Sequence, residues 1–536
     1  MTLALDRPEV SEAGRAKTNL GGLALTALLL ALASIPFLYL VQRVRTISGA
    51  ELQAILLRPK TLEIILNTFT LAIVVATLSV LIGTLFASLI FSSNFRSRGI
   101  LLALSALPLA IPSYVFTYCW IAIWPSFRGF WAAALVLTLS TMPYILLAAF
   151  AALRRIDRVQ VDVARSLGCN RFQVFTRIIL PQIRNSIAAS TLLVILYVFS
   201  DFGAVSLLGV DTFTRAIQNL YRASFDRQSA AFLGLILVLF AAILILAEER
   251  MQRRTIGARS TSRIKEEIAL ITKRAPKALA FTAIIAYSLL ALAVPAYVLV
   301  TRMVDNFQGI EFASLIAATF NTVLVASLGA TIAILFALPL AWTIISTRNR
   351  FALATEKVVL ITHALPGVVL GLSLVAFSSE IPWLYQSIAL LAFAYTLLFL
   401  AKGVGATRTS IERVPQGLKE VATTLGVSPW ETMRRVTIPL AAPGIGVGFL
   451  LILLTAMKEL PATLMLRPTG FDTLAIEIWS AASINRFNEA APYALLLILI
   501  AAIPTFILSR PDRQFQDESK SKVPNQMRKG GIDDIS

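Results

Sequence analysis

The chain has 536 residues, of which 57% are hydrophobic and only 15% are charged. Soluble proteins carry about 25% charged residues, so this composition argues against a soluble enzyme, a disordered scaffold and a nucleic-acid-binding protein. The net charge of +18 fits the excess of lysine and arginine that membrane proteins keep in cytoplasmic loops next to anionic lipid. We therefore expect a polytopic membrane protein whose non-protein partner is membrane lipid.

Twelve apolar stretches follow one another along the chain, most of them near the 20 residues that a helix needs to cross about 30 Å of hydrocarbon. In chain order they are residues 21–42, 63–93, 100–123, 130–152, 186–209, 230–247, 278–301, 318–345, 358–378, 388–402, 442–466 and 491–508. With both termini inside, the inner segments hold 35 Lys and Arg residues and the outer segments 11. This bias predicts cytoplasmic N- and C-termini. We expect Pro108, Pro112 and Pro366 to kink or break their spans.

The second half of the chain repeats the first. Asp162-Val-Ala-Arg-Ser-Leu-Gly168 returns as Glu420-Val-Ala-Thr-Thr-Leu-Gly426, 258 residues later, and Pro181 returns as Pro439. Asn-Thr pairs at 67–68 and 321–322 open matching spans. Two six-span halves must share one orientation, so the repeat is parallel. The predicted organisation is a cytoplasmic tail (1–20), a first half (21–247), a basic cytoplasmic linker (248–277), a second half (278–508) and a cytoplasmic tail (509–536).

The repeated loops, 162–181 and 420–439, have the pattern of short amphipathic helices. Val163, Ala164 and Leu167 fall on one helical face, and Leu418, Val421, Ala422 and Leu425 fall on the corresponding face. Gly168 and Gly426 then stop each helix, and a second short stretch runs to the proline that breaks it. A helix lying on the membrane surface would also be amphipathic. However, the preserved glycine-to-proline spacing favours docking to a two-fold cytoplasmic protein.

These loops resemble the "EAA" signature of binding-protein-dependent ABC importer permeases, which reads Glu-Ala-Ala, three residues, Gly, nine residues, Ile, any residue, Leu-Pro. The positions that carry the resemblance are Asp162, Ala164, Gly168, Leu180, Pro181, Glu420, Ala422, Gly426, Ile438 and Pro439. The first copy departs from the signature at Asp162 and Val163, and the second at Val421, Val436 and Ile438. The resemblance implies an all-α fold of type I importer kind in a bacterial inner membrane.

The resemblance also implies a mechanism and partners. Each loop would form a coupling helix in a groove of one of two copies of a cytoplasmic ATP-binding subunit, and an external or periplasmic binding protein would deliver the substrate. The sequence contains no Gly-rich phosphate loop ending in Gly-Lys-Ser/Thr. ATP and Mg²⁺ are therefore expected on the partner, and this chain is expected to be neither an enzyme nor a holder of a cofactor.

Two acidic residues occupy equivalent places in the spans that follow the loops. Asp201 and Glu459 are 258 residues apart, and an intramembrane carboxylate usually faces a bundle interior or an aqueous cavity. They are candidates for a cation pathway. Local pairing near the outer interface, for example with Lys458, or a role in helix packing are the alternatives.

The sequences around the two acids resemble fused ferric-iron importer permeases, with thiamine permeases of the same layout as the closest rival. With one histidine, His363, no tight metal site is expected, and a permease needs only weak binding to let an ion pass. The outer arginines either dock the binding protein or are solvated loop charges; they are Arg215, Arg222, Arg227, Arg467 and Arg486. An ion-coupled secondary carrier or a channel would leave the duplicated loops without a purpose.

Overall fold

The structure is a computed structural model that describes residues 20–92, 98–156, 158–224, 226–256, 274–347, 350–363 and 365–509. Its regular structure is entirely helical within these residues. In the described part of the chain, ten helical segments are long and apolar enough to cross a membrane, and two bent pairs bring the spans to as many as 12. The prediction of an all-α protein with about twelve spans is confirmed. Residues 1–19, 257–273 and 510–536, which hold most of the expected tails and linker, lie outside the described residues.

The helices of the first half, in chain order, are α1 (Leu20–Arg45), α2 (Gly49–Leu57), α3 (Pro59–Ser92), α4 (Arg98–Ala106), η1 (Leu107–Ala110), α5 (Ser113–Ile123), α6 (Phe130–Leu153), α7 (Arg158–Ser166), α8 (Arg171–Val174), η2 (Phe175–Ile179), α9 (Leu180–Ser200), α10 (Gly203–Leu207), α11 (Phe213–Arg222) and α12 (Arg227–Ile256).

Those of the second half are α13 (Arg274–Ser288), η3 (Leu289–Ala293), α14 (Val294–Asp305), η4 (Phe307–Gly309), α15 (Phe312–Thr347), α16 (Arg350–His363), α17 (Gly367–Ser378), α18 (Ile388–Glu412), α19 (Gln416–Thr424), α20 (Pro429–Thr432), η5 (Met433–Thr437), α21 (Ile438–Ala456), α22 (Pro461–Leu466), α23 (Leu474–Ser483) and α24 (Phe487–Ser509).

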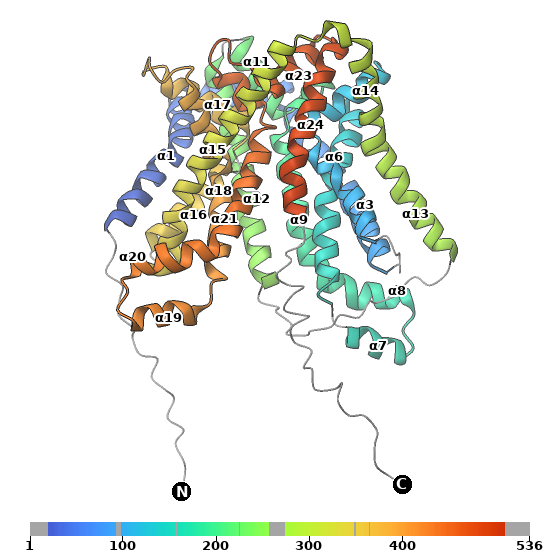
Figure 1. Ribbon diagram of the computed structural model, residues 1–536. Coiled ribbons are helices and arrows are strands. Elements are labelled where there is room, and N and C mark those ends of the chain that lie inside the picture. The colour runs from blue at the N-terminus through green and yellow to red at the C-terminus, as the bar shows by residue number, and fades with distance from the viewer. Residues whose placement is uncertain are drawn as a thin grey trace, which may run out of the picture.

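The two halves have the same internal packing and are interlocked. Helices α3, α6 and α9 pack together in the first half, as α15, α18 and α21 do in the second. The first span of each half crosses to the other half: α1 packs against α16 and α17, and α14 packs against α5. Figure 1 shows the result, with α1 beside the second-half helices and α13 beside α3. Short helices lie at both ends of the bundle, α7 and α19 at one and α11 and α23 at the other.

Two spans are sharply bent at the same place in each half. The chain turns by 90° between residues 99–110 and 113–123, and by 108° between 351–363 and 367–378. Pro112 and Pro366 are the residues that precede α5 and α17 at these bends. Proline cannot continue an α-helix because it lacks the N–H and its ring strikes the preceding turn. The predicted breaks at these two prolines are confirmed.

Pro181 and Pro439 behave differently from the prediction. Each follows a π-helical turn, η2 or η5, in which a backbone N–H reaches five residues back, as Leu180 does to Phe175. Residues 172–200 and 430–456 therefore form continuous spans, and the expected break at each proline is wrong. The wider turn moves away the carbonyl that the proline ring would otherwise strike.

The Asn-Thr pairs of the repeat form hydrogen bonds that hold α11 to α3 and α23 to α15. They lie inside α3 and α15, and not at the starts of these helices. Asn67 donates to the Asp211 carbonyl at 3.3 Å and Asn321 to the Asp472 carbonyl at 3.0 Å. The adjacent hydroxyls of Thr68 and Thr322 accept the first backbone N–H groups of α11 and α23. These equivalent sets of hydrogen bonds, which we call the clasps, fix α11 and α23 at the same end of the bundle.

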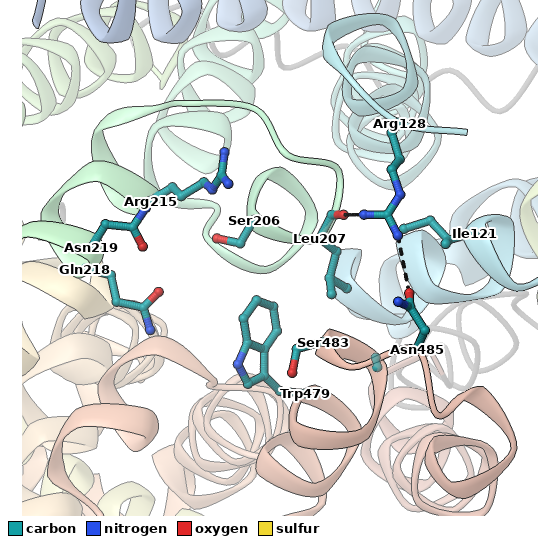
Figure 2. A pocket seen from close by; sticks show the side chains of 11 residues that line it. Ile121, Arg128, Ser206, Leu207, Arg215, Gln218, Asn219, Trp479, Ser483 and Asn485 are labelled. Atoms are coloured by element: carbon teal, nitrogen blue, oxygen red, sulfur yellow. Dashed lines mark hydrogen bonds between the residues drawn. The ribbon is translucent and has the colours of Figure 1, made fainter. Parts of the chain in front are cut away.

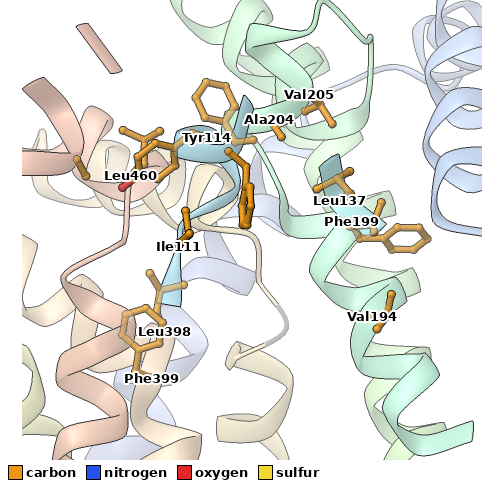
Figure 3. Close-up of a cluster of buried hydrophobic side chains, with 14 of the residues drawn as sticks. Ile111, Tyr114, Leu137, Val194, Phe199, Ala204, Val205, Leu398, Phe399 and Leu460 are labelled. Carbon is orange, nitrogen blue, oxygen red and sulfur yellow. The ribbon is translucent and has the colours of Figure 1, made fainter. Parts of the chain in front are cut away.

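An apolar core joins the halves beside the bends. Figure 3 shows Tyr114 of α5 and Phe199 of α9 in the same buried cluster as Leu398 of α18 and Leu460. Because close-packed side chains of both halves meet there, a movement of one half is transmitted to the other.

Candidate functional site

The repeated loops form two short helices, α7 and α19, at one end of the bundle. Gly168 and Gly426 follow these helices with φ angles of 84° and 75°, in the left-handed region that glycine adopts without strain. Cys169 donates its N–H to the Ala164 carbonyl at 3.0 Å, and Val427 donates to Ala422 at 3.1 Å. These reach-back bonds close the helix ends as a Schellman motif does. The glycines are helix stops, as the sequence indicates.

The apolar face expected for each helix is divided between two surfaces. Ala164 and Ala422 are buried at 6% and 7% exposure, where they hold the helices against the rest of the chain. Leu167 and Leu425 are 78% and 76% exposed. Only the alanine of each expected face packs against the rest of the chain, and the other members of the face stay exposed; they are Val163, Leu167, Leu418, Val421 and Leu425. Most of each face therefore presents leucine and valine side chains to the surroundings.

The exposed strip includes two aromatic residues that the sequence reasoning missed. Phe172 and Trp430 are 75% and 66% exposed, and they lie 258 residues apart like the rest of the repeat. That same offset is the signal by which they could have been found. Together with Val163, Val421, Leu167 and Leu425 they form what we call the apolar strips, one per half. Because α7 contacts α8 and α19 contacts α20, the exposed apolar side chains of each half gather in one region, as they do at interaction surfaces.

The remaining positions of the signature have distinct places. Asp162 and Glu420 are exposed on α7 and α19. Leu180 begins α9 and Ile438 begins α21, each followed directly by its proline. These residues link the short helices to the long spans that enter the bundle.

The two acidic residues lie just beyond helix ends, and not inside the spans as expected. Helix α9 ends at Ser200 and α21 at Ala456. The Asp201 carboxylate accepts the Ala204 N–H at 3.0 Å, and the Glu459 carboxylate accepts the Ala462 N–H at 3.0 Å. The acids thus cap the short helices α10 and α22 in equivalent ways, as carboxylates near helix N-termini do.

The two capping sites differ by a compensating exchange. In the first half Ser113 donates to Asp201. Its counterpart, 254 residues later, is Gly367, where an added Cβ would collide with the Glu459 side chain. The longer glutamate therefore fills the space that the serine side chain takes in the first half. Sequence reasoning had no means to pair these residues, because they come from different helices.

Besides the two capping acids, two lysines of the second half carry charge in the interior. Lys402 donates to the Thr455 hydroxyl at 3.0 Å, and Lys458 donates across the halves to the Leu109 carbonyl at 3.0 Å. We call Asp201, Lys402, Lys458 and Glu459 the central charges. Within the described residues, no group of three or more His, Cys, Asp or Glu side chains is placed to hold a metal ion.

Several outer arginines are engaged by neighbours in their own half. Arg215 pairs with Asp211 at 2.6 Å, Arg467 pairs with Asp472, and Arg486 pairs with Glu489 at 3.5 Å. The guanidinium of Arg227 lies 5.7 Å from the centre of the Tyr221 ring.

Comparison with known proteins supplies the family. The model of the "Binding-protein-dependent transport system inner membrane component" family matches this chain twice, over residues 79–257 and 329–515. The chain belongs to this family. The double match confirms a fused, multi-pass inner-membrane permease of two repeated halves, and its relatives are translocation subunits.

Three relatives indicate the range of substrates around this permease. It is 30% identical over 89% of its length to the Fe(3+)-transport system permease protein FbpB 2 of Haemophilus influenzae, of which 95% is covered. It is 33% identical over 30% of its length to the putative 2-aminoethylphosphonate transport system permease protein PhnV of Salmonella typhimurium, of which 61% is covered. The molybdenum transport system permease protein ModB of Azotobacter vinelandii is 25% identical over 36% of this chain and 92% of its own length. Thiamine, the rival substrate, is not favoured by these matches.

Proposed function

We propose that this permease imports ferric iron, delivered by an external binding protein, through alternating access driven by a separate ATPase. The observation that carries the ATPase coupling is the pair of apolar strips. Their exposed leucine and aromatic side chains recur at one spacing in both halves. The helices that carry them, α7, α8, α19 and α20, lie at one end of the bundle (Figure 1). A partner with two equivalent grooves would bury both strips at once.

The same arrangement supports coupling from the ATPase, through the short helices, to the long spans. In each half the α7 or α19 helix is joined through a glycine stop and a π turn to the span that ends at an acidic cap. Two copies of the ATP-binding subunit, holding ATP and Mg²⁺, would bring the strips together when they close. The charge bias of the loops supports a cytoplasmic location for this end and for both termini.

The assignment of ferric iron is supported by the full-length relative named for Fe(3+) transport. The test is uptake of radiolabelled ferric iron by cells that lack the chain and by cells in which it is restored. The proposal predicts iron uptake that returns with the chain and collapses when ATP is depleted. Uptake of labelled thiamine or molybdate in place of iron would change the substrate, and uptake that needs only an ion gradient would contradict ATPase coupling.

The role of Asp201 and Glu459 as a cation pathway is part of this proposal and needs its own test. Both carboxylates already accept backbone N–H groups, so their loss has a structural cost. In Asp201→Asn with Glu459→Gln the amide oxygens keep the caps while the charges are removed. A pathway role predicts lower iron flux at unchanged amounts of assembled protein, whereas unchanged flux would leave the acids as caps alone.

A further inference from the structure

A polar pocket of about 250 Å³ lies between the two halves at the α11/α23 end of the bundle (Figure 2). Helix α11 contributes Arg215, Gln218 and Asn219 from the first half, and α23 contributes Trp479 from the second. Gln218 and Trp479 occupy equivalent positions, 261 residues apart. The pocket is therefore built where the repeats face each other, which is where duplicated transporters place their substrate route.

The pocket is positively charged. Its lining includes Arg128 and Arg215 and contains no acidic residue. Arg215 is neutralised by Asp211. Arg128 makes only neutral contacts, to the carbonyls of Pro125 and Leu207 and to the Asn485 side chain, each at 3.3 Å. No ion pair formed by the described residues includes Arg128.

The uncharged groups around Arg128 are suited to an anion. Gln218, Asn219 and Asn485 bring amide N–H donors to the lining, and Asn485 is held in the left-handed region with φ of 62°. The Ser206 hydroxyl is shielded from solvent and has no hydrogen-bond partner within the described part of the chain. Guanidinium and amide donors converging on one space match the oxygens of a phosphate or a carboxylate.

The central charges bring no net negative charge to offset the positive charge of the pocket. The formal charges of the four central charges cancel, and both carboxylates among them already accept hydrogen bonds from helix N–H groups. A bare trivalent cation would thus be repelled at the pocket before it could reach Asp201 and Glu459. A complex with an anionic outer face would instead be attracted to the pocket.

We propose that this pocket binds an oxyanion, so that ferric iron passes it as a complex in which phosphate or carboxylate groups face outward. The inference rests on the proposed function for its metal, but the pocket itself is defined by Arg128 and its neighbours. A carboxylate on the surface of the binding protein has the same chemistry. We assign the pocket to a small oxyanion of the substrate, and the experiment distinguishes it from a carboxylate of the binding protein.

A second pocket provides a matched control. It has a volume of about 300 Å³ and also lies between the halves. Tyr221 and Arg227 of the first half line it together with Val375 of the second, which is the counterpart of Ile121. Its one charged lining residue, Arg227, is placed over the Tyr221 ring, and no amide side chain lines it. Removing Arg227 should therefore leave oxyanion binding unchanged.

The experiment measures binding of radiolabelled inorganic phosphate to the full-length permease with its ATPase in lipid nanodiscs, without binding protein. We expect saturable binding that falls at least tenfold in Arg128→Gln and is unchanged in Arg227→Gln. Arg128 is exposed, and its side chain makes only three long hydrogen bonds, so the Arg128→Gln variant should fold. Equal melting temperatures of the three proteins would verify this.

Docking of the binding protein to the same nanodiscs is measured in parallel. Unchanged docking in Arg128→Gln supports the small-oxyanion site. Absence of phosphate binding to the unaltered protein, or loss of docking without phosphate binding, overturns it. If phosphate binding depends on Arg128 but the chain does not restore iron uptake, the oxyanion site is supported. Only the assignment of ferric iron as the substrate is then refuted.

Discussion

Replacement of Gly426 tests whether the shape of the repeated loop is what couples it to a partner. Gly426 has a φ of 75°, and an added Cβ would meet nothing within 4 Å. The cost of a side chain there is therefore a backbone cost alone. For an L-residue in the left-handed region it is about 1–2 kcal/mol, which changes the population of the stopped helix by a factor of about 5–30.

The expected order of damage follows from the same backbone preference. Asparagine tolerates the left-handed region, alanine less so, and a β-branched residue least. ATP-dependent uptake should therefore be reduced least in Gly426→Asn, more in Gly426→Ala and most in Gly426→Val. The amount of protein in the membrane, measured by immunoblot, should be unchanged. Gly168→Val, at a φ of 84°, should have the same effect in the first half.

Gly417 offers a matched control at the other end of the same helix. A Cβ added to it also meets nothing within 4 Å, and its φ is not in the left-handed range. Gly417→Ala should keep full uptake, since alanine favours a helix by about 1 kcal/mol over glycine. Equal uptake in Gly426→Val and Gly417→Ala would refute the reasoning that the glycine stop transmits the coupling.

Three further predictions concern stability and use melting of the purified permease. Gly367→Ser should lower stability by about 1–3 kcal/mol through overpacking against Glu459, and adding Glu459→Asp should restore most of it; no rescue would refute the exchange between the halves. Thr322→Val removes the acceptor of a buried N–H at the start of α23 and should cost about 1–3 kcal/mol, whereas Thr319→Val, whose hydroxyl bonds only within its own helix, should cost less; equal losses would contradict the clasp. Burial raises the pKa of the Glu477 carboxyl, so its contribution to stability is full below pH 4.5 and is lost as pH rises through the raised pKa; Glu477→Gln should therefore melt higher than the unaltered protein at pH 7.5, with a gap that closes toward pH 4, and a gap independent of pH would count against it.

Much of the fold was predictable because its signals are local. Apolar length predicts a span, proline at 112 or 366 predicts a bend, and a glycine after an amphipathic stretch predicts a helix stop; each depends on neighbouring residues only. The repeat then doubles every signal. The same 258-residue offset could have revealed Phe172 and Trp430 as a pair.

What the sequence did not predict depends on contacts between distant segments. Hydropathy extended the fifth and eleventh spans through the acids, because it cannot show that Asp201 and Glu459 turn to cap the next helix. The prolines at 181 and 439 were expected to break their helices, because a π turn has no simple sequence signature. The pocket around Arg128 and the crossing of α1 to the second half arise only when the halves are assembled.

The central claim is that the apolar strips are the surface on which a separate ATPase drives transport. The most direct measurement is co-purification of the ATP-binding subunit with a tagged permease carrying Leu167→Asp and Leu425→Asp. The control carries Ser166→Asp and Thr424→Asp, at exposed neighbouring positions whose hydroxyls bond only to their own helices. We predict that the leucine variant loses the ATPase and its ATP-dependent iron uptake while the control keeps both. Retention of the ATPase by the leucine variant would contradict the account.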